Sequence, residues 1–290
     1  MPKIDARGLS LYYELDGPEG APVIVLTRGL GSQIIEWPKA LSQGLAGAGF
    51  RVLQYDNRDA GLSEKLGPCE TPDSPPPAIY SVYDMAADLV GMLEALEIDR
   101  AHLFGISMGG MISQVAAADY PTRVRSLISV MSSAGEAHSI QGPKEAMNAL
   151  FEPWPAMQDR EGAIAKMARD AAIYGSPVFL KTAAEHRSEA EAVVARCYCP
   201  GGIARQRSAM ENSGSRVHLL PQIRCPTLVI HGDRDPLIPL ATGEKAARII
   251  PGATMKCFAG MAHDLPGPLM PQMVEVVVAH CRKADAVGAA

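Results

Sequence analysis

The chain has 290 residues, of which 47% are hydrophobic and 20% are charged. This balance is typical of a folded protein with a large apolar core and excludes a disordered chain. The formal net charge of -5 argues against nucleic acid or an anionic membrane surface as a partner. No stretch approaches the roughly 18 uninterrupted apolar residues of a membrane span, and the N-terminus shows no apolar signal segment. We therefore expect no membrane partner and a cytoplasmic location.

Short apolar segments punctuated by Gly, Pro and Asp recur along the chain. Their length and lack of strict alternation indicate strands that are buried on both faces of a parallel sheet. The predicted strands cover residues 22–27, 50–56, 101–107, 124–131, 226–232 and 253–260. Segments with helical periodicity, such as residues 82–98 and 111–120, separate some of them. This alternation predicts an α/β fold with a mostly parallel, doubly wound sheet.

The alternation stops between about Ala134 and Arg216. This stretch is rich in Ala, Glu, Met and Arg, contains helix-like pieces at 160–172 and 181–197, and shows no convincing strand. We interpret it as a helical insertion over the sheet, with a separate helical domain as the alternative. The predicted division is a core formed by residues 1–133 and 216–290, with a helical cap of residues 134–215.

Six cysteines are scattered without the spacing of a disulfide framework: Cys69, Cys197, Cys199, Cys225, Cys257 and Cys281. Cys197 and Cys199 lack the second pair or nearby histidine that would complete a zinc site. We therefore expect free thiols in a reducing compartment and no metal. Cys69 lies in the proline-rich segment 66–80, which predicts a loop within the core and not a linker between folding units.

The residues G-I-S-M-G at 105–109 place Ser107 between a predicted strand and a helix. A strand that turns directly into a helix projects the intervening side chain outward, and the flanking glycines relieve crowding at the bend. The N-terminus of the helix also points backbone N–H groups, including that of Met108, toward this place. Ser107 is therefore a candidate nucleophile, with an ordinary glycine turn as the alternative.

A serine hydroxyl needs a base, a group that orients the base, and donors for the oxyanion. Asp233 and Asp235 follow the strand predicted at 226–232, and His263 follows the strand predicted at 253–260. The carboxyl ends of parallel strands are where sites assemble in open α/β sheets, and the order Ser, acid, His fits a triad. We favour Asp235 as the acid over Asp233, for which capping of the turn is the alternative role. Asp264 adjoins the base, and the remaining histidines lack this context: His102, His138, His186, His218, His231 and His280.

Together these motifs resemble the α/β-hydrolase family. GISMGG resembles the nucleophile elbow of the family, HGDRDPLIP its acid loop, GMAHDLP its histidine loop and LTRGLGS its oxyanion loop. The resemblance covers essentially the whole chain and implies the α/β-hydrolase fold, with residues 134–215 where the family carries its cap. It implies Ser107 as nucleophile, His263 as general base and then acid, Asp235 as the group that orients the imidazole, and the backbone N–H groups of Leu30 and Met108 as the oxyanion hole.

Two positions depart from the pattern of the family. Arg28 stands where the family usually has a histidine, and we expect it to pair with a loop carboxylate. The alternative is a guanidinium that reaches the pocket and binds an acidic or carbonyl-rich substrate group. Asp59 replaces a glycine in QYDNRDAGLSE (54–64). This variant, together with GLGSQIIEWP, resembles a subgroup of polyketide methylesterases such as aclacinomycin methylesterase.

The resemblance implies a cofactor-independent serine hydrolase that cleaves carboxylic esters through an acyl-enzyme, acting as a monomer or homodimer. The low aromatic content and the modest length of the cap favour small to medium apolar esters, with aliphatic polyesters as a further class. Trp37, Trp154 and the methionines of 134–215 are candidate linings of an acyl pocket, with ordinary packing as the alternative. The alternative functions are a haloperoxidase-like perhydrolase, a ligand receptor with very slow turnover, and a carbon–carbon bond hydrolase of aromatic catabolism.

Overall fold

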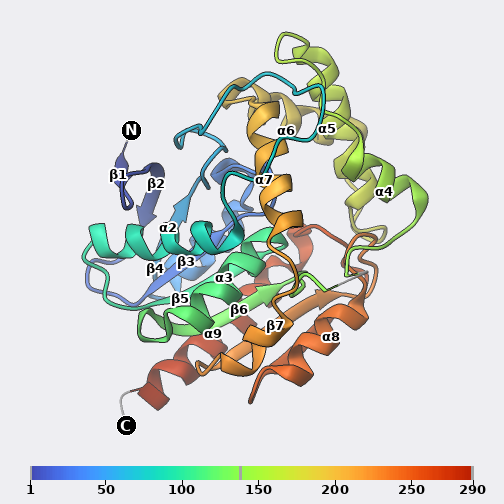
Figure 1. Ribbon diagram of the computed structural model, residues 1–290. Coiled ribbons are helices and arrows are strands. Elements are labelled where there is room, and N and C mark those ends of the chain that lie inside the picture. Colours follow the sequence, from blue (N-terminus) through green and yellow to red (C-terminus); the bar gives the residue numbers. More distant parts are fainter. Residues whose placement is uncertain (1, 137–138, 289–290) are drawn as a thin grey trace.

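The computed structural model describes residues 2–136 and 139–288 (Figure 1). Its centre is an eight-stranded sheet in the order β1-β2-β4-β3-β5-β6-β7-β8. All neighbouring strands from β4 to β8 along this order pair in parallel. The first two strands extend the sheet in antiparallel fashion. The predicted fold class, a mostly parallel doubly wound sheet, is confirmed.

The parallel strands lie within the ranges predicted from the sequence. They are β3 (Val23–Thr27), β4 (Arg51–Tyr55), β5 (Ala101–Ile106), β6 (Val124–Val130), β7 (Thr227–Gly232) and β8 (Thr254–Phe258). β3, β5 and β7 are buried along their whole length, since helices cover both faces of the sheet. The sequence analysis did not predict β1 (Lys3–Asp5) and β2 (Ser10–Asp16), whose mixed burial fits the edge of a sheet.

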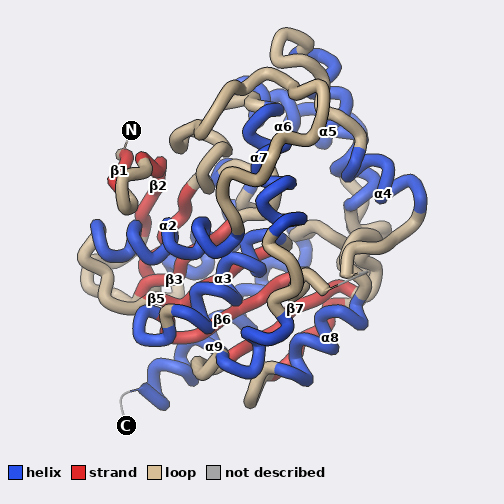
Figure 2. The backbone as a smooth tube through the Cα atoms, viewed as in Figure 1, coloured by secondary structure: helices blue, strands red, loops and turns tan. Residues whose placement is uncertain are grey.

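Helices cover the two faces of the sheet in separate layers. One layer holds α2 (Val82–Ala95), α3 (Met108–Asp119) and α8 (Leu240–Ile249), and the other holds α1 (Lys39–Gly47) and α9 (Met270–Gly288). Side chains alternate between the layers, so that Val25 packs with the first and Leu26 with the second. Figure 2 shows α2 and α3 in front of the strands. No helix in the described ranges combines the length and apolar character needed to cross a bilayer.

Among the described residues, four α-helices lie between β6 and β7, and we call them the inserted helices. They are α4 (Lys144–Phe151), α5 (Arg160–Tyr174), α6 (Ala183–Arg196) and α7 (Pro200–Asn212). The helices predicted at 160–172 and 181–197 correspond to α5 and α6. Figure 1 shows the inserted helices gathered at one end of the sheet, away from the C-terminus. The Arg216 N–H donates to the Ala134 carbonyl at 2.6 Å and joins the two ends of this segment, while the domain bounds at 134 and 215 stay a prediction.

The remaining regular elements are short 3-10 turns: η1 (Ile34–Glu36), η2 (Pro121–Arg123), η3 (Val217–Gln222) and η4 (Gly267–Leu269). The first of them follows the loop at the end of β3, and a reciprocal cap joins the residue before it, Gln33, to its last residue, Glu36. The Gln33 N–H donates to the carboxylate of Glu36 at 2.5 Å, and the Glu36 N–H donates to the Gln33 carbonyl at 3.1 Å. This cap fixes where the loop after β3 ends.

Cys69 and Cys199 form a disulfide, so the prediction that these two cysteines are free thiols is wrong. Their Cα atoms lie 4.4 Å apart although 130 residues separate them in the sequence. The proline-rich loop meets the start of α7, where the Gly201 N–H donates to the Cys69 carbonyl at 2.9 Å. Tertiary packing brings these two cysteines together, so the spacing of cysteines in the sequence does not predict the disulfide. The other four cysteines are free.

Candidate active site

Ser107 lies at the bend between β5 and α3 with backbone angles φ 53° and ψ -122°. A residue with a side chain rarely adopts this conformation, so the surrounding structure must hold it there. The bend leaves no room for side chains at Gly105 and Gly109, which lie two residues to either side of Ser107. A Cβ atom on Gly105 would lie 2.2 Å from the Gly109 carbonyl oxygen, and one on Gly109 would lie 2.1 Å from the carbonyl oxygen of Thr27. The glycines on either side of Ser107 are therefore required by close backbone approach.

Ser107, His263 and Asp235 form a continuous chain of hydrogen bonds. His263 Nε2 lies 3.1 Å from Ser107 Oγ, and His263 Nδ1 lies 2.8 Å from Asp235 Oδ2. The Asp235 side chain is fully buried, whereas the His263 side chain remains 10% exposed. The structure thus brings together the three side chains that the sequence analysis selected, each in the segment that follows a parallel strand.

The Asp235 carboxylate is held in its ionised form. Its Oδ1 accepts hydrogen bonds from the backbone N–H groups of Leu237 at 2.8 Å and Ile238 at 2.9 Å. Burial on its own would raise the pKa of Asp235, but the neighbouring His263 and the Ile238 N–H outweigh it and lower the pKa. Because Oδ2 faces Nδ1 of His263, this carboxylate can fix the tautomer that leaves Nε2 free to accept a proton.

The alternative carboxylates do not contact the imidazole of His263 among the described residues. Asp233 Oδ1 accepts a hydrogen bond from the Gly260 N–H at 2.7 Å and so ties two neighbouring loops together. Asp264 accepts a hydrogen bond from the hydroxyl of Ser176. The geometry therefore favours Asp235 over both of its neighbours. His138, one of the other histidines, lies outside the described residues.

The inserted helices support the loop that carries His263, and the sequence analysis missed these contacts. The His263 N–H donates to the carbonyl of Tyr174, the last residue of α5, at 3.0 Å. Ser176 is 2% exposed, and its hydroxyl accepts from the Ala262 N–H at 2.8 Å while it donates to Asp264. Nothing in the sequence around Ser176 forms a motif that would have singled it out.

The loop after β3 passes directly beside Ser107. A Cβ atom on Gly29 would lie 3.2 Å from the Cβ atom of Ser107. Leu30 follows on this loop and lines the same cavity as Ser107, and Met108 is the first residue of α3. Within the described part of the chain, neither the Leu30 N–H nor the Met108 N–H donates a hydrogen bond to a protein acceptor. Both groups are available to an oxygen atom bound beside Ser107.

Arg28 points toward η1. Its Nη2 lies 3.6 Å from the Glu36 carboxylate, and its guanidinium carbon lies 4.8 Å from the centre of the Trp37 ring. Burial lowers the pKa of Arg28, and the charge of Glu36 opposes this shift. The loop carboxylate expected to pair with Arg28 is therefore Glu36.

A narrow cavity of about 30 Å³ opens at Ser107. The described residues that line it are Leu30, Ser107, Met111, Ile140, Leu150, Met210, Leu237, Ile238 and His263. Trp37 packs edge-on against Phe104 and Trp154 against Tyr198, and neither tryptophan belongs to this lining. Both tryptophans therefore have the alternative role of ordinary packing, whereas Met210 of the inserted helices does line the cavity.

Comparisons with known proteins place this geometry in a family. The family described as "alpha/beta hydrolase fold" matches residues 22–266, a range that includes Ser107, Asp235 and His263. A putative carbamate hydrolase, RutD from Variovorax paradoxus, is 30% identical over 269 residues, which cover 89% of this chain and 91% of that protein. Rhodomycin D methylesterase DnrP from Streptomyces peucetius is 25% identical over 295 residues, which cover 95% of this chain and 96% of that protein.

Solved structures agree on the fold. The crystal structure of the enol-lactonase from Burkholderia xenovorans LB400 superposes with a TM-score of 0.77 at 24% identity, covering 96% of this chain and 99% of that chain. The family match spans the sheet from β3 to β8 together with the inserted helices. The resemblance read from the sequence motifs is thereby confirmed, and the chain belongs to the α/β-hydrolase fold family.

Proposed function

We propose that the protein is a serine hydrolase that cleaves carboxylic esters, with Ser107, His263 and Asp235 as its catalytic triad. The observation that carries the proposal is the hydrogen-bond chain from Ser107 Oγ through His263 to Asp235, with distances of 3.1 Å and 2.8 Å. A nucleophile, a base and a buried anion in this order are the groups that acyl transfer needs.

The first half of the reaction forms an acyl-enzyme. Nε2 of His263 accepts the proton of Ser107 as Oγ attacks the carbonyl carbon of the ester. The oxygen of the tetrahedral intermediate accepts hydrogen bonds from the N–H groups of Leu30 and Met108, each of which contributes about 3 kcal/mol to stabilisation of the transition state. The bond from carbon to the leaving alcohol oxygen then breaks, and His263 donates its proton to that oxygen.

The second half releases the acid. His263 accepts a proton from a water molecule as the water oxygen attacks the acyl carbon, and the proton returns to Ser107 Oγ when the acyl–serine bond breaks. Asp235 holds the imidazole and stabilises its protonated form in both halves. The lowered pKa of Asp235 supports this role, since the carboxylate keeps its charge.

The cavity supports small apolar substrates. Its lining is apolar apart from the reacting groups, and its volume is about 30 Å³. Esters and carbamates are the test substrates, because the chain is related to a putative carbamate hydrolase and to a methylesterase. Aliphatic polyesters stay a prediction from the sequence.

The test is a chain-length series of p-nitrophenyl esters together with a p-nitrophenyl carbamate, measured on the wild type and on Ser107→Ala. We expect the wild type to prefer short acyl chains, and we expect Ser107→Ala to lose at least about 10³-fold in kcat.

Asp233→Asn is the matched control for Asp235→Asn, because both remove a carboxylate from the same turn and only Asp235 contacts His263. Turnover that survives in Ser107→Ala would refute the nucleophile, and a wild type without turnover would favour the ligand receptor.

A further inference from the structure

The direction of the Leu30 N–H depends on a short turn. We call residues Gly29 to Gln33 the oxyanion loop. A trans peptide is planar and its N–H points opposite to its C=O, so the Gly29 carbonyl and the Leu30 N–H point in opposite directions. The Gly29 carbonyl accepts a hydrogen bond from the Ser32 N–H at 3.3 Å. The Leu30 N–H therefore points away from this turn, and any tilt of the turn redirects it.

One side chain of α7 holds the turn. Gln206 is fully buried, and its Oε1 accepts a hydrogen bond from the Gly31 N–H at 2.7 Å. Its Nε2 donates to the Arg58 carbonyl at 2.6 Å, so the amide links the oxyanion loop to the loop after β4. Gly31 has a φ of 69°, and a Cβ atom on it would lie 3.1 Å from Cγ1 of Ile203. The turn and α7 are therefore in close steric contact as well. The peptide next to Leu30 is thus fixed by an inserted helix.

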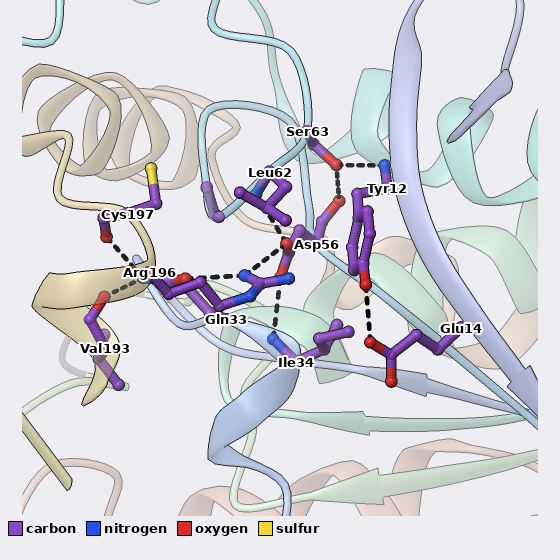
Figure 3. A network of polar contacts seen from close by, with 12 residues as sticks. Tyr12, Glu14, Gln33, Ile34, Asp56, Leu62, Ser63, Val193, Arg196 and Cys197 are labelled. Atoms are coloured by element: carbon purple, nitrogen blue, oxygen red, sulfur yellow. Dashed lines mark hydrogen bonds and ion pairs between the residues drawn. The ribbon is translucent and has the colours of Figure 1, made fainter. Parts of the chain in front are cut away.

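The far end of the oxyanion loop is held by α6 (Figure 3). Gln33 donates from Nε2 to the carbonyls of Val193 at 3.0 Å and Cys197 at 2.6 Å. Its Oε1 accepts from Arg196 at 2.7 Å, and the same guanidinium pairs with the buried Asp56 carboxylate at 2.8 Å. Gln33 itself is 2% exposed, so its amide is shielded from bulk water and depends on these partners. Two inserted helices therefore hold the loop, α7 at its middle residue Gly31 and α6 at its last residue Gln33.

We propose that Gln206 is a positioning residue that sets the direction of the Leu30 N–H in the oxyanion hole, with Gln33 fixing the other end of the same loop. This inference rests on the proposed function, since it concerns a donor of that mechanism. Removal of the Gln206 amide leaves the Gly31 N–H buried without its acceptor, and the turn must tilt to find another. An oxyanion-hole donor acts in the transition state, so the tilt slows the chemical step more than it weakens substrate binding.

The experiment compares Gln206→Met with Ser208→Ala. Methionine keeps the length and apolar volume of the side chain and removes both hydrogen bonds. Ser208 is a matched control, because it lies on the same helix, is 3% exposed and donates to the Pro76 carbonyl at 2.8 Å, away from the oxyanion loop. Each protein is measured for kcat and KM on a p-nitrophenyl ester, for the rate of covalent labelling by a fluorophosphonate, and for thermal stability.

We expect Gln206→Met to lower both kcat and the labelling rate by about 10- to 100-fold, because displacement of a catalytic donor by about 1 Å has an effect of this size. KM should stay near the wild-type value, and Ser208→Ala should keep both rates despite a similar loss of thermal stability. Equal rates in the two variants, or a loss confined to KM, would overturn the proposal. Gln33→Met acts on the other end of the loop and is expected to lower kcat in the same way, which keeps the test valid where Gln206→Met does not fold.

The labelling rate separates this inference from the proposed function. Phosphonylation of Ser107 builds negative charge on an oxygen in the same hole, and it needs no turnover of an ester. A wild type that is labelled but cleaves neither esters nor carbamates would refute the proposed function, and the labelling ratio would then decide the role of Gln206 alone. A wild type that is not labelled at Ser107 would overturn both.

Discussion

Asp59 stands where the family pattern has a glycine, and its side chain has a structural role. It adopts a φ of 66°, a region where glycine is the usual residue. Its carboxylate accepts hydrogen bonds from Arg205 Nε at 3.0 Å and Nη2 at 2.6 Å, and from the Tyr80 hydroxyl at 2.8 Å. Asp59 and Arg205 are 1% and 6% exposed, so the pair is buried between the core and α7. The carboxylate that replaces the glycine is therefore the counter-ion of Arg205 on α7.

Asp59→Gly is therefore expected to destabilise the protein although it relieves the backbone. The substitution leaves the buried guanidinium of Arg205 without its carboxylate, which costs about 3–5 kcal/mol. Urea denaturation measures the change in the free energy of unfolding. The double variant Asp59→Gly/Arg205→Met removes the unpaired charge and should recover part of the loss. A single glycine variant as stable as the wild type would contradict this role of Asp59.

At the residue scale, the sequence identified side chains that sit in local motifs and missed those that support them. Ser107, Asp235 and His263 each follow a predicted strand, so strand order alone places them at one edge of the sheet. Gln206 reaches Gly31 across 175 residues, and its position on α7 carries no local pattern. A buried polar residue of this kind is recognisable only when its partners are known.

At the scale of elements, the inserted helices hold both loops that flank Ser107. The end of α5 and the residues after it contact the loop of His263, and α6 and α7 contact the oxyanion loop. Helices that cover a site often serve only to exclude water, but these also fix the backbone of the reacting groups. The geometry of the site is therefore a joint product of the core and the inserted segment.

Ser176→Ala tests the contact between this segment and the loop of His263. The substitution removes the acceptor of the Ala262 N–H and the donor to Asp264, so the imidazole loses support on the side facing α5. We expect kcat on a p-nitrophenyl ester to fall about 10-fold with KM unchanged, because a displaced base acts on the chemical step. Thr182→Ala is the control, since its hydroxyl caps α6 and lies in the same stretch of chain. Equal kcat values in both variants would show that Ser176 does not position His263.

The elements that the sequence predicted best are the buried parallel strands. All six predicted strands appear in the structure. Burial on both faces explains the apolar runs of β3 to β7, whereas β8 lies at the edge of the sheet and is largely exposed or half-buried, so the expected two-sided burial is wrong for that strand. The two N-terminal strands β1 and β2 escaped prediction because polar residues interrupt their short pattern. The periodic pattern at 111–120 covers only part of α3. The helix begins at Met108, directly after the bend at Ser107 as the strand–turn–helix pattern predicts, and it has no capping side chain.

At the scale of the whole molecule, a buried histidine at the other end of β5 links stability to pH. His102 is fully buried, and its ring contacts the Ser126 hydroxyl at 2.8 Å and the Asp285 carboxylate at 3.3 Å. Burial lowers its pKa from 6.5 to about 4, against the opposing effect of Asp285, while Arg125 and His280 nearby add to the lowering. The imidazole is therefore neutral in the folded protein over most of the acid range.

The free energy of unfolding should fall as the pH drops from 6.5 toward about 4. In this window the unfolded chain binds a proton that folded His102 does not, so acid favours unfolding by up to about 3 kcal/mol. Below the pKa of His102 in the folded protein, the folded protein binds this proton too. The loss in the free energy of unfolding that His102 causes then stops growing. Urea denaturation across the window measures the slope.

The control for this prediction is a pair of substitutions. His102→Asn keeps a polar atom near Ser126 and removes the titrating group, so it should flatten the slope. His218→Asn removes an exposed histidine and should leave the slope as in the wild type. An unchanged slope in His102→Asn would assign the acid sensitivity to other groups.

The surroundings and assembly of the molecule were harder to predict than its fold. The location in the cytoplasm and the monomeric or homodimeric state stay predictions. The bond between Cys69 and Cys199 is of a kind more common in oxidising compartments, and it depends on a contact between distant segments that composition does not contain.

That bond makes a closed ring of the chain from Cys69 to Cys199. Ser107 lies inside the ring, whereas Asp235 and His263 lie on the tail that leaves it. Ile79, in the proline-rich stretch inside the ring, is 57% exposed and open to a protease. A single cut there gives two fragments, each holding one of the bonded sulfurs. The nicked protein should therefore migrate as one band on a denaturing gel and separate into two only after a reductant is added.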